Sequence, residues 1–442
     1  MSNTNYVIHN CYDSHTHFLA TGQVSLGLKL GGLTDPHDVA NLQIRSEHYR
    51  QNWLVGFGWN HHHWSTPEFP NRKILDLYFP HVPVFFSRAD GHASWLNTCA
   101  INELKKLGMR FDQDPVGGLI LRDSMTVEPT GILVDQAHIE ALLRLPAYTD
   151  VQNSYFLLES QKIFNQGGFT HVRDLSMNAP TWMLLSQLES QRKLTVCLDG
   201  FVTVESLQDF FRVHEQIQLM KARPCQYLRV HGIKVFVDGS LGSQTAYVSE
   251  HYLHSESKGS LIWNQEQLKE IFQLAWRHGY EVALHTIGDQ SLHEIILAAR
   301  AVSASGLLGR IHLEHVQLLR PETLQLMKPL HIICHMQPSH WLSDEKWLDQ
   351  VLPQSLMRYL FSWELLRKNK IPFYFGSDSP IEPPQLLLTK KAMQLKTKKT
   401  IPSLQEPWIL HHQHPDQAWT KSWTEFDDEA VRQVYFDGQP LL

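Results

Sequence analysis

Two histidines near the start of the chain, His15 and His17, are separated by one residue within the segment Asp13-Ser-His-Thr-His17. Alternate residues of a β-strand point to the same side, so on a strand the two imidazoles would project together. Neutral imidazole is a preferred ligand of zinc and similar divalent ions, and a carboxylate often completes such a ligand set. The pair therefore predicts one side of a metal site, although an HxH pair by itself is weak support.

Further candidate ligands lie in or just after short apolar runs later in the chain. His285 and His315 each follow such a run, and Asp378 follows the run Ile371–Phe375. Lys234 lies inside another apolar run. Polar residues at the ends of apolar runs indicate side chains at the ends of buried strands, where they can converge on one site.

The elements that would position these residues alternate between helix and strand. Asn264 fits a helix N-cap, with Gln267 at the capping-box position. Apolar residues then recur at helical spacing up to Gly279, which suits the left-handed end of a helix. Residues Tyr280–Leu284 read as a short buried strand, and the same unit recurs downstream. Strands that alternate with helices predict parallel βα units.

Eight such strands can be counted along the chain. Eight parallel βα units close a (β/α)8 TIM barrel, in which the functional side chains lie at the C-terminal ends of the strands. His15, His17 and the later candidates all occupy that position or lie within the strand that leads to it. The predicted strands are Tyr6–Tyr12, Phe169–Arg173, Thr195–Val202, Leu228–Val237, Tyr280–Leu284, Ile311–Glu314, His331–Met336 and Ile371–Phe375.

The predicted domain organisation follows from where this alternation is interrupted. Residues 1–44 contain the first barrel strand and its loop, and residues 45–165 form an inserted cap subdomain rich in Trp, His, Pro and Gly. Residues 166–390 complete the barrel. Residues 391–442 form a C-terminal tail with a remnant β-hairpin near Arg432–Gly438.

Composition and charge exclude several other classes of protein. The chain has a formal net charge of −6 and no basic stripe, which argues against a nucleic-acid partner. No apolar stretch approaches the roughly 20 residues of a membrane span, and the first residues do not resemble a secretory signal. The five scattered cysteines include no CxxC pair. We expect a cytoplasmic protein with a small-molecule substrate, and we leave a homodimer open.

Nine segments, in order along the chain, resemble the amidohydrolase superfamily. They are Asp13-Ser-His-Thr-His17, Gly56-Phe-Gly-Trp59, Arg88-Ala-Asp-Gly-His-Ala93, Pro129-Thr-Gly-Ile-Leu133, Gly232–Gly242, His285–Asp289, Glu314-His315, Gln337-Pro338 and Gly376-Ser-Asp378. The sequences of these segments are similar to those of the amidohydrolase-3 (YtcJ-like) branch, which includes N-substituted formamide deformylases.

The resemblance implies a set of metal ligands and a mechanism. It assigns one or two Zn²⁺ ions, or other divalent metals, to His15, His17, His285, His315 and Asp378. Lys234 resembles the lysine that the family carboxylates with CO2 to bridge two metals, because a carbamate can act as a ligand and an ammonium cannot. A metal-activated hydroxide would then cleave an amide or formamide-type C–N bond. Asp378 would act as the general acid–base group.

The resembling loops also suggest substrate-binding residues, each of which has a structural alternative. Trp59 can equally be a core residue, and the polar residues of the Arg88–Ala93 segment can stabilise their own loop. The histidine runs His61–His63 and His411–His414 are interpreted as solvated loops, since consecutive histidines cannot all face one ion. The candidates from these loops are Trp59, Arg88, Asp90 and His92. Gln337 and His340 are added because they follow the seventh predicted strand and could face the pocket.

The sequence departs from the family pattern at both ends, where the β-sandwich that usually flanks the barrel is expected to be reduced or missing. Two other functions stay open. One is a mononuclear deaminase of a heterocyclic amine, a class whose sites lack the bridging lysine and would therefore give Lys234 no role. The other is a catalytically inactive barrel used for binding.

Overall fold

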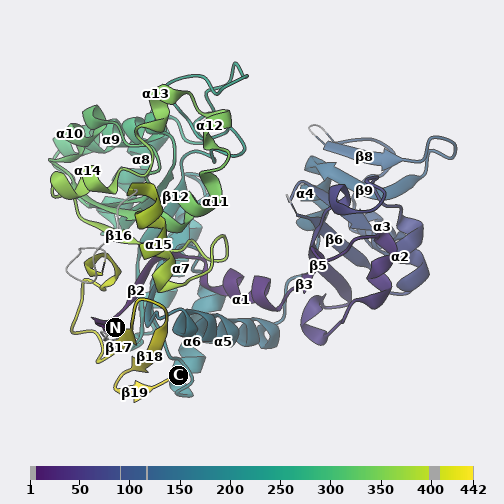
Figure 1. Ribbon diagram of the computed structural model, residues 1–442, viewed down its shortest axis with the longest axis horizontal. Helices are drawn as coiled ribbons and strands as arrows, with labels where there is room; N and C mark the ends of the chain where they lie inside the picture. The colour runs from purple at the N-terminus through teal and green to yellow at the C-terminus, as the bar shows by residue number, and fades with distance from the viewer. Residues whose placement is uncertain (1–5, 90, 116–117, 398–408, 442) are drawn as a thin grey trace. The chain divides into compact units, whose positions relative to one another are not determined.

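Eight parallel strands form a nearly closed barrel in the computed structural model, which describes residues 6–89, 91–115, 118–397 and 409–441 (Figure 1). Their order in the sheet is β16-β15-β14-β13-β12-β11-β10-β2. The two end strands meet at a parallel bridge between Thr16 and Ser379. The predicted TIM barrel is confirmed. Its strands are β2 (Tyr12–Thr16), β10 (His171–Asp174), β11 (Cys197–Thr203), β12 (Leu228–Phe236), β13 (Glu281–Thr286), β14 (Arg310–His315), β15 (His331–Met336) and β16 (Phe373–Phe375).

Helices follow the barrel strands, as the sequence pattern predicts. Helix α8 begins after Asn264, whose side chain accepts a hydrogen bond from the backbone N–H of Gln267, and the reciprocal capping-box bond is also present. Gly279 has a φ of +69° beyond the last turn. The helices of this unit are α6 (Ala179–Ser190), α7 (Phe210–Lys221), α8 (Gln265–Arg277), α9 (Asp289–Ala304), α10 (Pro321–Met327), α11 (Pro338–Asp344), α12 (Leu348–Val351), α13 (Gln354–Met357), α14 (Trp363–Lys368), α15 (Leu386–Thr397) and the short η4 (Leu410–His412).

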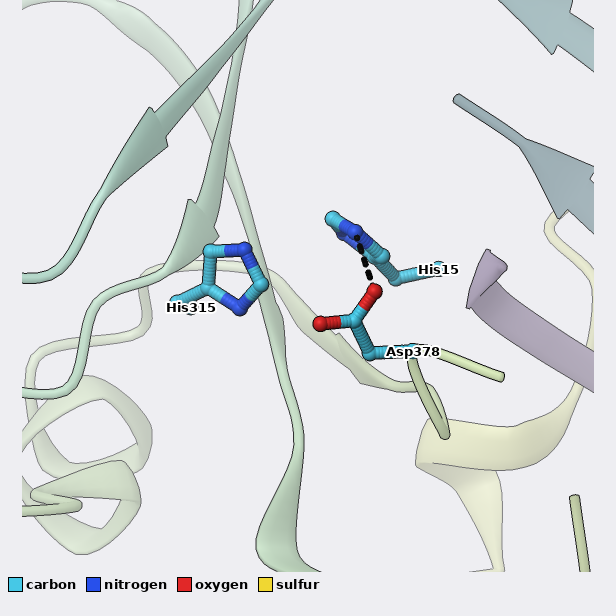
Figure 2. A group of neighbouring side chains, drawn as sticks. All are labelled: His15, His315 and Asp378. Atoms are coloured by element: carbon cyan, nitrogen blue, oxygen red, sulfur yellow. Dashed lines mark ion pairs between the residues drawn. The ribbon is translucent and has the colours of Figure 1, made fainter. Parts of the chain in front are cut away.

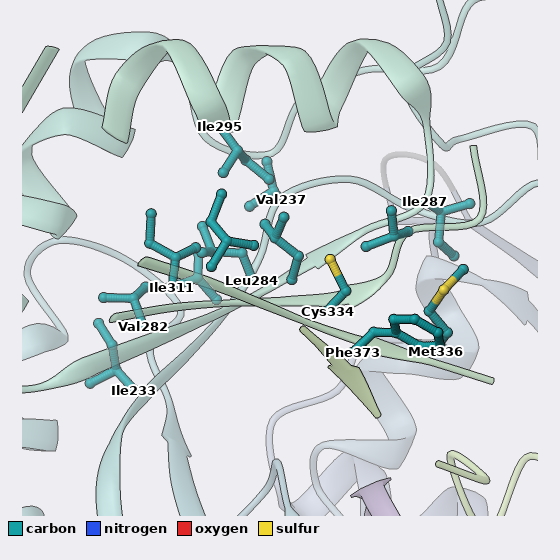
Figure 3. Packing of buried hydrophobic residues seen from close by; sticks show 14 of the residues in the cluster. Ile233, Val237, Val282, Leu284, Ile287, Ile295, Ile311, Cys334, Met336 and Phe373 are labelled. Atoms are coloured by element: carbon teal, nitrogen blue, oxygen red, sulfur yellow. The ribbon is translucent and has the colours of Figure 1, made fainter. Parts of the chain in front are cut away.

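The main hydrophobic core lies between the barrel strands and these helices. Figure 3 shows side chains from several strands packed together, with Ile295 approaching them from a helix. Val282 and Leu284 on β13 and Ile311 on β14 are fully buried in this layer. Because side chains alternate along a strand, the residues between them point into the barrel.

The interior of the barrel is unusually polar. Arg173 on β10 forms an ion pair with Glu314 on β14, and these strands are separated by three others in the sheet. The pair therefore spans the inside of the barrel rather than joining neighbouring strands. Most TIM barrels fill this space with branched apolar side chains. Here charged side chains occupy much of it, which bears directly on the functional site.

The first predicted strand requires a correction, because Tyr6–Tyr12 is not one strand. Asn10 adopts a left-handed conformation with φ +46°, and this breaks the extended chain. The residues before it form β1 (Tyr6–His9), which pairs with β17 (Trp423–Phe426) in a four-stranded antiparallel sheet with β18 (Val431–Phe436) and β19 (Gln439–Pro440). This small sheet includes the predicted C-terminal hairpin.

Residues Gln23–Phe156 form a second compact unit. Its mixed sheet has the order β3-β5-β6-β7-β9-β8, with β4 paired to β5, and two apolar clusters form its core. The elements are β3 (Leu28–Lys29), η1 (Pro36–Asn41), η2 (Ser46–His48), β4 (Tyr49–Arg50), β5 (Trp53–Trp59), η3 (His61–His63), α2 (Arg72–Tyr78), β6 (Val84–Arg88), β7 (Ala93–Leu96), α3 (Thr98–Lys106), β8 (Gly118–Arg122), β9 (Pro129–Asp135) and α4 (Gln136–Leu142).

The second unit differs in extent from the insertion expected at residues 45–165. It begins earlier because β3 pairs in parallel with β5, so Leu28 and Lys29 belong to the same sheet. Helices α1 (Phe18–Leu26) and α5 (Asp150–Gln166) contain its two boundaries with the barrel unit. A cap function for this unit stays a prediction. Within the described residues, the structure contains no helix that is both long and apolar enough to cross a membrane.

The barrel closes where Gly376 follows β16, and this position leaves no space for a side chain. A Cβ atom on Gly376 would lie 2.5 Å from the backbone nitrogen of His15 and 2.9 Å from its Cβ. We expect Gly376→Ala to lower the free energy of unfolding by about 1–3 kcal/mol, the usual cost of overpacking, and to displace His15. Urea denaturation and zinc titration would measure both effects. Gly32→Ala is the matched control, since a Cβ there meets nothing within 4 Å; equal stability of the two variants would contradict the expectation.

Candidate functional site

Three predicted ligands gather at the C-terminal end of the barrel. His15 lies on β2, His315 ends β14 and Asp378 follows β16, and one ligand atom from each lies within 4.8 Å of the others. Figure 2 shows the Asp378 carboxylate between the two imidazole rings. All three side chains are buried. Their spacing matches that of groups that share one metal ion.

The remaining predicted ligands lie around this group. His17 Nε2 is 3.3 Å from Asp378 Oδ1, which is also 3.2 Å from His15 Nε2. The His285 ring is centred 4.5 Å from that of His315. Burial opposes ionisation of Asp378, but the facing histidines His15 and His17 hold its pKa well below the ordinary value. The carboxylate is therefore charged and faces imidazole nitrogens.

His15 is held in place by a buried chain of ionic contacts. Its Nδ1 lies 2.7 Å from Glu314 Oε2, and Glu314 Oε1 accepts a hydrogen bond of 2.8 Å from Arg173 Nη1. Burial would raise the pKa of Glu314, but Arg173 and His15 hold it well below its ordinary value. An ionised carboxylate can accept but not donate, so His15 Nδ1 carries the proton. With a cation bound in the site, the Nε2 atom would be the one to present its lone pair to that ion.

A second hydrogen bond orients His315 in the same way. Its Nδ1 lies 2.8 Å from Gln337 Oε1, and Gln337 Nε2 donates to the backbone oxygen of His335. That second bond fixes which end of the amide faces His315, so His315 Nδ1 is the donor. Burial and the neighbouring His285 keep the pKa of His315 well below its ordinary value. His315 is thus neutral, which is the form that binds metal.

Lys234 is fully buried on β12. Within the described part of the chain, its Nζ has no hydrogen-bond partner, although it lies 5.0 Å from the centre of the Phe236 ring. Burial lowers the pKa of this amine to about 8, and the charges of Glu314 and Asp378 only partly oppose that effect. A buried ammonium without an acceptor is costly. The environment therefore suits an uncharged amine or a modified one.

The backbone is strained at two site residues. His315 has φ +72° and Asp378 has φ +59°, both in the left-handed region that residues with a Cβ rarely adopt. Such conformations cost about 1–3 kcal/mol each and are found disproportionately at functional sites. Here they turn the chain just as it leaves β14 and the β16 segment. The turns bring both side chains to the mouth of the barrel.

The predicted substrate-binding residues of the second unit have other contacts. Trp59 is completely buried, and its indole N–H donates to the backbone oxygen of Phe86, so its observed role is structural. His92 is exposed, and its Nδ1 lies within hydrogen-bond distance, 3.0 Å, of Asp135 Oδ1. Arg88 lies 6.0 Å above the Phe69 ring. Asp90 lies outside the described residues.

The two predicted substrate residues after β15 lie beside the candidate metal ligands. Gln337 Oε1 accepts a hydrogen bond from His315 Nδ1, so the observed contact of Gln337 orients a candidate metal ligand. His340 Nε2 is 3.7 Å from Asp378 Oδ2, and its ring is parallel to that of His315 at 6.1 Å. His340 therefore lies where it can contact a molecule bound at the site.

The interpretation of the two histidine runs as solvated loops is wrong for part of each run. His61 is buried and stacks on Phe69 with ring centroids 4.3 Å apart. His412 and His414 are also buried, and His414 Nε2 lies 2.7 Å from Asp199 Oδ2. His414 turns inward because the buried Asp199 carboxylate is available to pair with it.

Sequence reasoning missed several residues that support the site. Arg173 and Glu314 form the chain behind His15, and Asp13 Oδ1 accepts a hydrogen bond from the backbone nitrogen of Ser377. Phe236, at the end of β12, stays 38% exposed beside His285, with ring centroids 5.3 Å apart. A signal was available: Arg173 and Glu314 are charged residues inside predicted buried strands, where each requires a partner.

The donor set fits a divalent metal ion. Two imidazoles and one carboxylate are ligands typical of zinc. The site also contains buried polar atoms, Asp378 Oδ1, Lys234 Nζ and His340 Nε2, that have no hydrogen-bond partner among the described residues. A bound cation would give the carboxylate oxygen a partner. These features support a metal-dependent reaction at this end of the barrel.

Comparison with known proteins identifies similar chains. The sequence model of the amidohydrolase family matches residues 12–396. The chain is 31% identical over 388 residues to the putative amidohydrolase YtcJ of Bacillus subtilis, covering 85% of this chain and 70% of YtcJ. It is 25% identical to the N-substituted formamide deformylase of Arthrobacter pascens, covering 66% of this chain and 55% of that protein.

A solved structure has the same fold. The crystal structure of an uncharacterized metal-dependent hydrolase from Pyrococcus furiosus superposes with a TM-score of 0.72 at 23% identity, covering 88% of this chain and 76% of that one. This similarity supports the TIM-barrel assignment.

The chain behind His15 gives a sharp test of how the site is held together. Glu314→Gln leaves the Arg173 charge buried without its counter-charge, so we expect the free energy of unfolding to fall by about 3–5 kcal/mol. Loss of a carboxylate that orients a metal-binding histidine should also weaken zinc binding by about 10–100-fold. Urea denaturation and competition with a chromophoric chelator would measure the two effects.

Glu364→Gln is the control for this experiment, because Glu364 pairs with Arg367 at the surface. That exposed pair should contribute at most about 1 kcal/mol to stability. If Glu314→Gln and Glu364→Gln behaved alike, the buried chain would not support the site.

Proposed function

The chain belongs to the amidohydrolase family, and on that premise we propose that it hydrolyses an amide or formamide-type C–N bond in a small molecule. The observation that carries the proposal is the group formed by His15, His315 and Asp378 at the mouth of the barrel. The formamide class is favoured by the similarity to a protein named N-substituted formamide deformylase. Membership of the family supports hydrolysis, and the type of bond that is hydrolysed is our proposal.

We propose that the site holds one or two zinc ions. His15, His17, His285, His315 and Asp378 would be the ligands, with Lys234 as a bridging ligand if it is carboxylated. When bound, such an ion acidifies a water molecule and polarises the carbonyl of the substrate. The hydrogen bonds from Nδ1 of His15 and His315 orient the two rings, and both Nε2 atoms would then be the ones to bind the ion.

Asp378 is the group proposed to move protons. Its carboxylate would accept a proton from the attacking water at one oxygen and return it to the leaving nitrogen. His340 lies 3.7 Å from Asp378 Oδ2 and is proposed to position the carboxylate or the substrate. The exposed ring of Phe236 gives an apolar surface next to His285 for the nitrogen substituent.

Removal of metal tests the proposed reaction. Protein treated with a chelator should lose hydrolysis of a panel of N-substituted formamides, simple amides and lactones, and zinc should restore it. Asp378→Asn, which keeps an oxygen ligand but removes the base, should lower kcat by about 10²–10⁴-fold while metal content stays close to one ion or two. Stopped assays and elemental analysis would provide the readouts.

The outcomes separate the competing functions. Activity on heterocyclic amines but not on amides would favour a deaminase, and absence of any divalent ion in protein purified without chelator would favour an inactive barrel used for binding. His331→Gln is the control, because His331 is exposed at the opposite end of β15. It should retain normal kcat and metal content.

The carboxylation of Lys234 can be tested separately. We propose that the buried amine adds CO2, because its Nζ lacks a hydrogen-bond partner among the described residues. Metal-free protein reloaded with zinc in CO2-depleted buffer should recover little activity, and added bicarbonate should raise it severalfold. Intact-protein mass spectrometry under non-acidic conditions, or ¹³C NMR with labelled bicarbonate, would detect the carbamate. Lys234→Met should abolish the bicarbonate response; an unchanged response would contradict the proposal.

The predicted location and assembly remain part of the proposal. All five cysteines lie in the described residues and none of them forms a disulfide, a pattern typical of the reducing cytoplasm. We retain the small-molecule substrate as the expected partner and a homodimer as an open assembly.

A further inference from the structure

A cavity opens at the end of the barrel opposite the candidate metal site. It has a volume of about 460 Å³ and is lined by at least one residue from each of the eight barrel strands. Tyr12 and Glu281, which line it, are the first residues of β2 and β13, whereas His15 and His285 lie later in those strands. The cavity is therefore at the N-terminal end of the strands, and its volume suits a small molecule.

The acidic groups of this cavity already have partners. Asp199 Oδ1 is 2.6 Å from His231 Nε2, and its Oδ2 is 2.7 Å from His414 Nε2. Glu281 pairs with Arg310 at 2.9 Å. The carboxylates are satisfied by groups of this chain, so the cavity does not offer unpaired negative charge to a cation.

The unsatisfied groups of Arg173 are hydrogen-bond donors. Arg173 lines the cavity and is 1% exposed, and its Nε and Nη2 have no hydrogen-bond partner among the described residues. These two nitrogens form one edge of the guanidinium, and the Nη1 atom on the other side holds Glu314. An Nε–Nη2 edge carries two parallel N–H groups, which match the two oxygens of a carboxylate.

His335 adds a further buried nitrogen beside this edge. Its Nδ1 also has no partner in the described part of the chain, while its Nε2 lies 2.9 Å from His312 Nδ1. Burial and the charge of Arg173 keep the pKa of His335 well below its ordinary value, so the ring is neutral. Ionised Glu281 accepts a hydrogen bond from His312 Nε2, so His312 Nδ1 accepts one from His335 Nε2, and the neutral His335 ring presents a lone pair at Nδ1.

Aromatic rings form much of the rest of the wall. Phe201 lies against Arg173, with the guanidinium carbon 4.1 Å from the ring centre, and Tyr12 and Tyr374 meet edge to face at 5.8 Å. These surfaces favour a flat apolar body rather than a hydrated inorganic ion. A doubly charged anion would also face Asp199 and Glu281 across the cavity.

We propose that this cavity is a second ligand site that binds a small aromatic monocarboxylate. The carboxylate accepts two hydrogen bonds from Nε and Nη2 of Arg173, and the ring lies among Phe201, Tyr12 and Tyr374. The site is separate from the metal centre and does not depend on the proposed hydrolysis.

Titration of benzoate into the full-length, metal-free protein tests the proposal by calorimetry, because without metal a carboxylate cannot bind as a metal ligand. We expect one benzoate per chain. Benzamide has the same shape without the charge and should bind at least about 10-fold more weakly, the value of a charge-assisted hydrogen bond. Inorganic phosphate should not displace benzoate.

Two variants of β15 provide a matched comparison. Ile333→Trp fills the cavity that Ile333 lines and leaves every charged group in place, so it should abolish benzoate binding. His331→Gln changes the exposed first residue of the same strand and should leave the affinity unchanged. Zinc-loaded protein should still bind benzoate in this cavity, and Ile333→Trp should retain its zinc.

Benzoate binding no tighter than that of benzamide would overturn the proposal, and so would equal binding by Ile333→Trp. The comparison of benzoate with benzamide uses the unmodified chain, so it decides the question even if Ile333→Trp does not fold. Loss of hydrolysis in any of these experiments would concern the metal site and not this one.

Discussion

The ion pair between Arg173 and Glu314 is the interaction on which the rest of the barrel interior depends. It crosses the barrel from β10 to β14 and continues to His15 on β2. Two buried charges of opposite sign cost much less together than either would alone, so neither residue can be replaced without changing the other. The same pair fixes the tautomer of a candidate metal ligand. A stability requirement and a functional one are therefore met by one contact.

The barrel can have a polar interior because its hydrophobic core lies between the strands and the surrounding helices. Alternation along each strand sends residues such as Val282, Leu284 and Ile311 outward against the helices, where they are completely buried. The inward positions are then free to carry charge, provided each charge finds a partner across the barrel. Arg173 meets this condition on its Nη1 side through Glu314, whereas its Nε and Nη2 atoms and Lys234 Nζ have no hydrogen-bond partner among the described residues.

The sequence predicts the architecture well because strands and helices leave local signals. The capping box at Asn264, the helix end at Gly279 and the buried strand after it all appear as expected. The break at Asn10 was missed because a single left-handed residue leaves no periodic signal. Contacts across the barrel, such as Arg173 with Glu314, join residues distant in sequence. Their pairing follows from the strand order, which spacing alone does not supply.

The contacts that close the barrel also assemble the candidate site. Strand β16 has three residues, and the chain after it completes the junction with β2 through Asp378 N–H to His15 O at 2.7 Å and His17 N–H to Ser379 O at 2.8 Å. These bonds hold Asp378 in its left-handed conformation, so the strain is offset by closing the barrel. A loosened junction would move His15, His17 and Asp378 together. The candidate ligands nearest one another therefore lie where the fold has least freedom to vary.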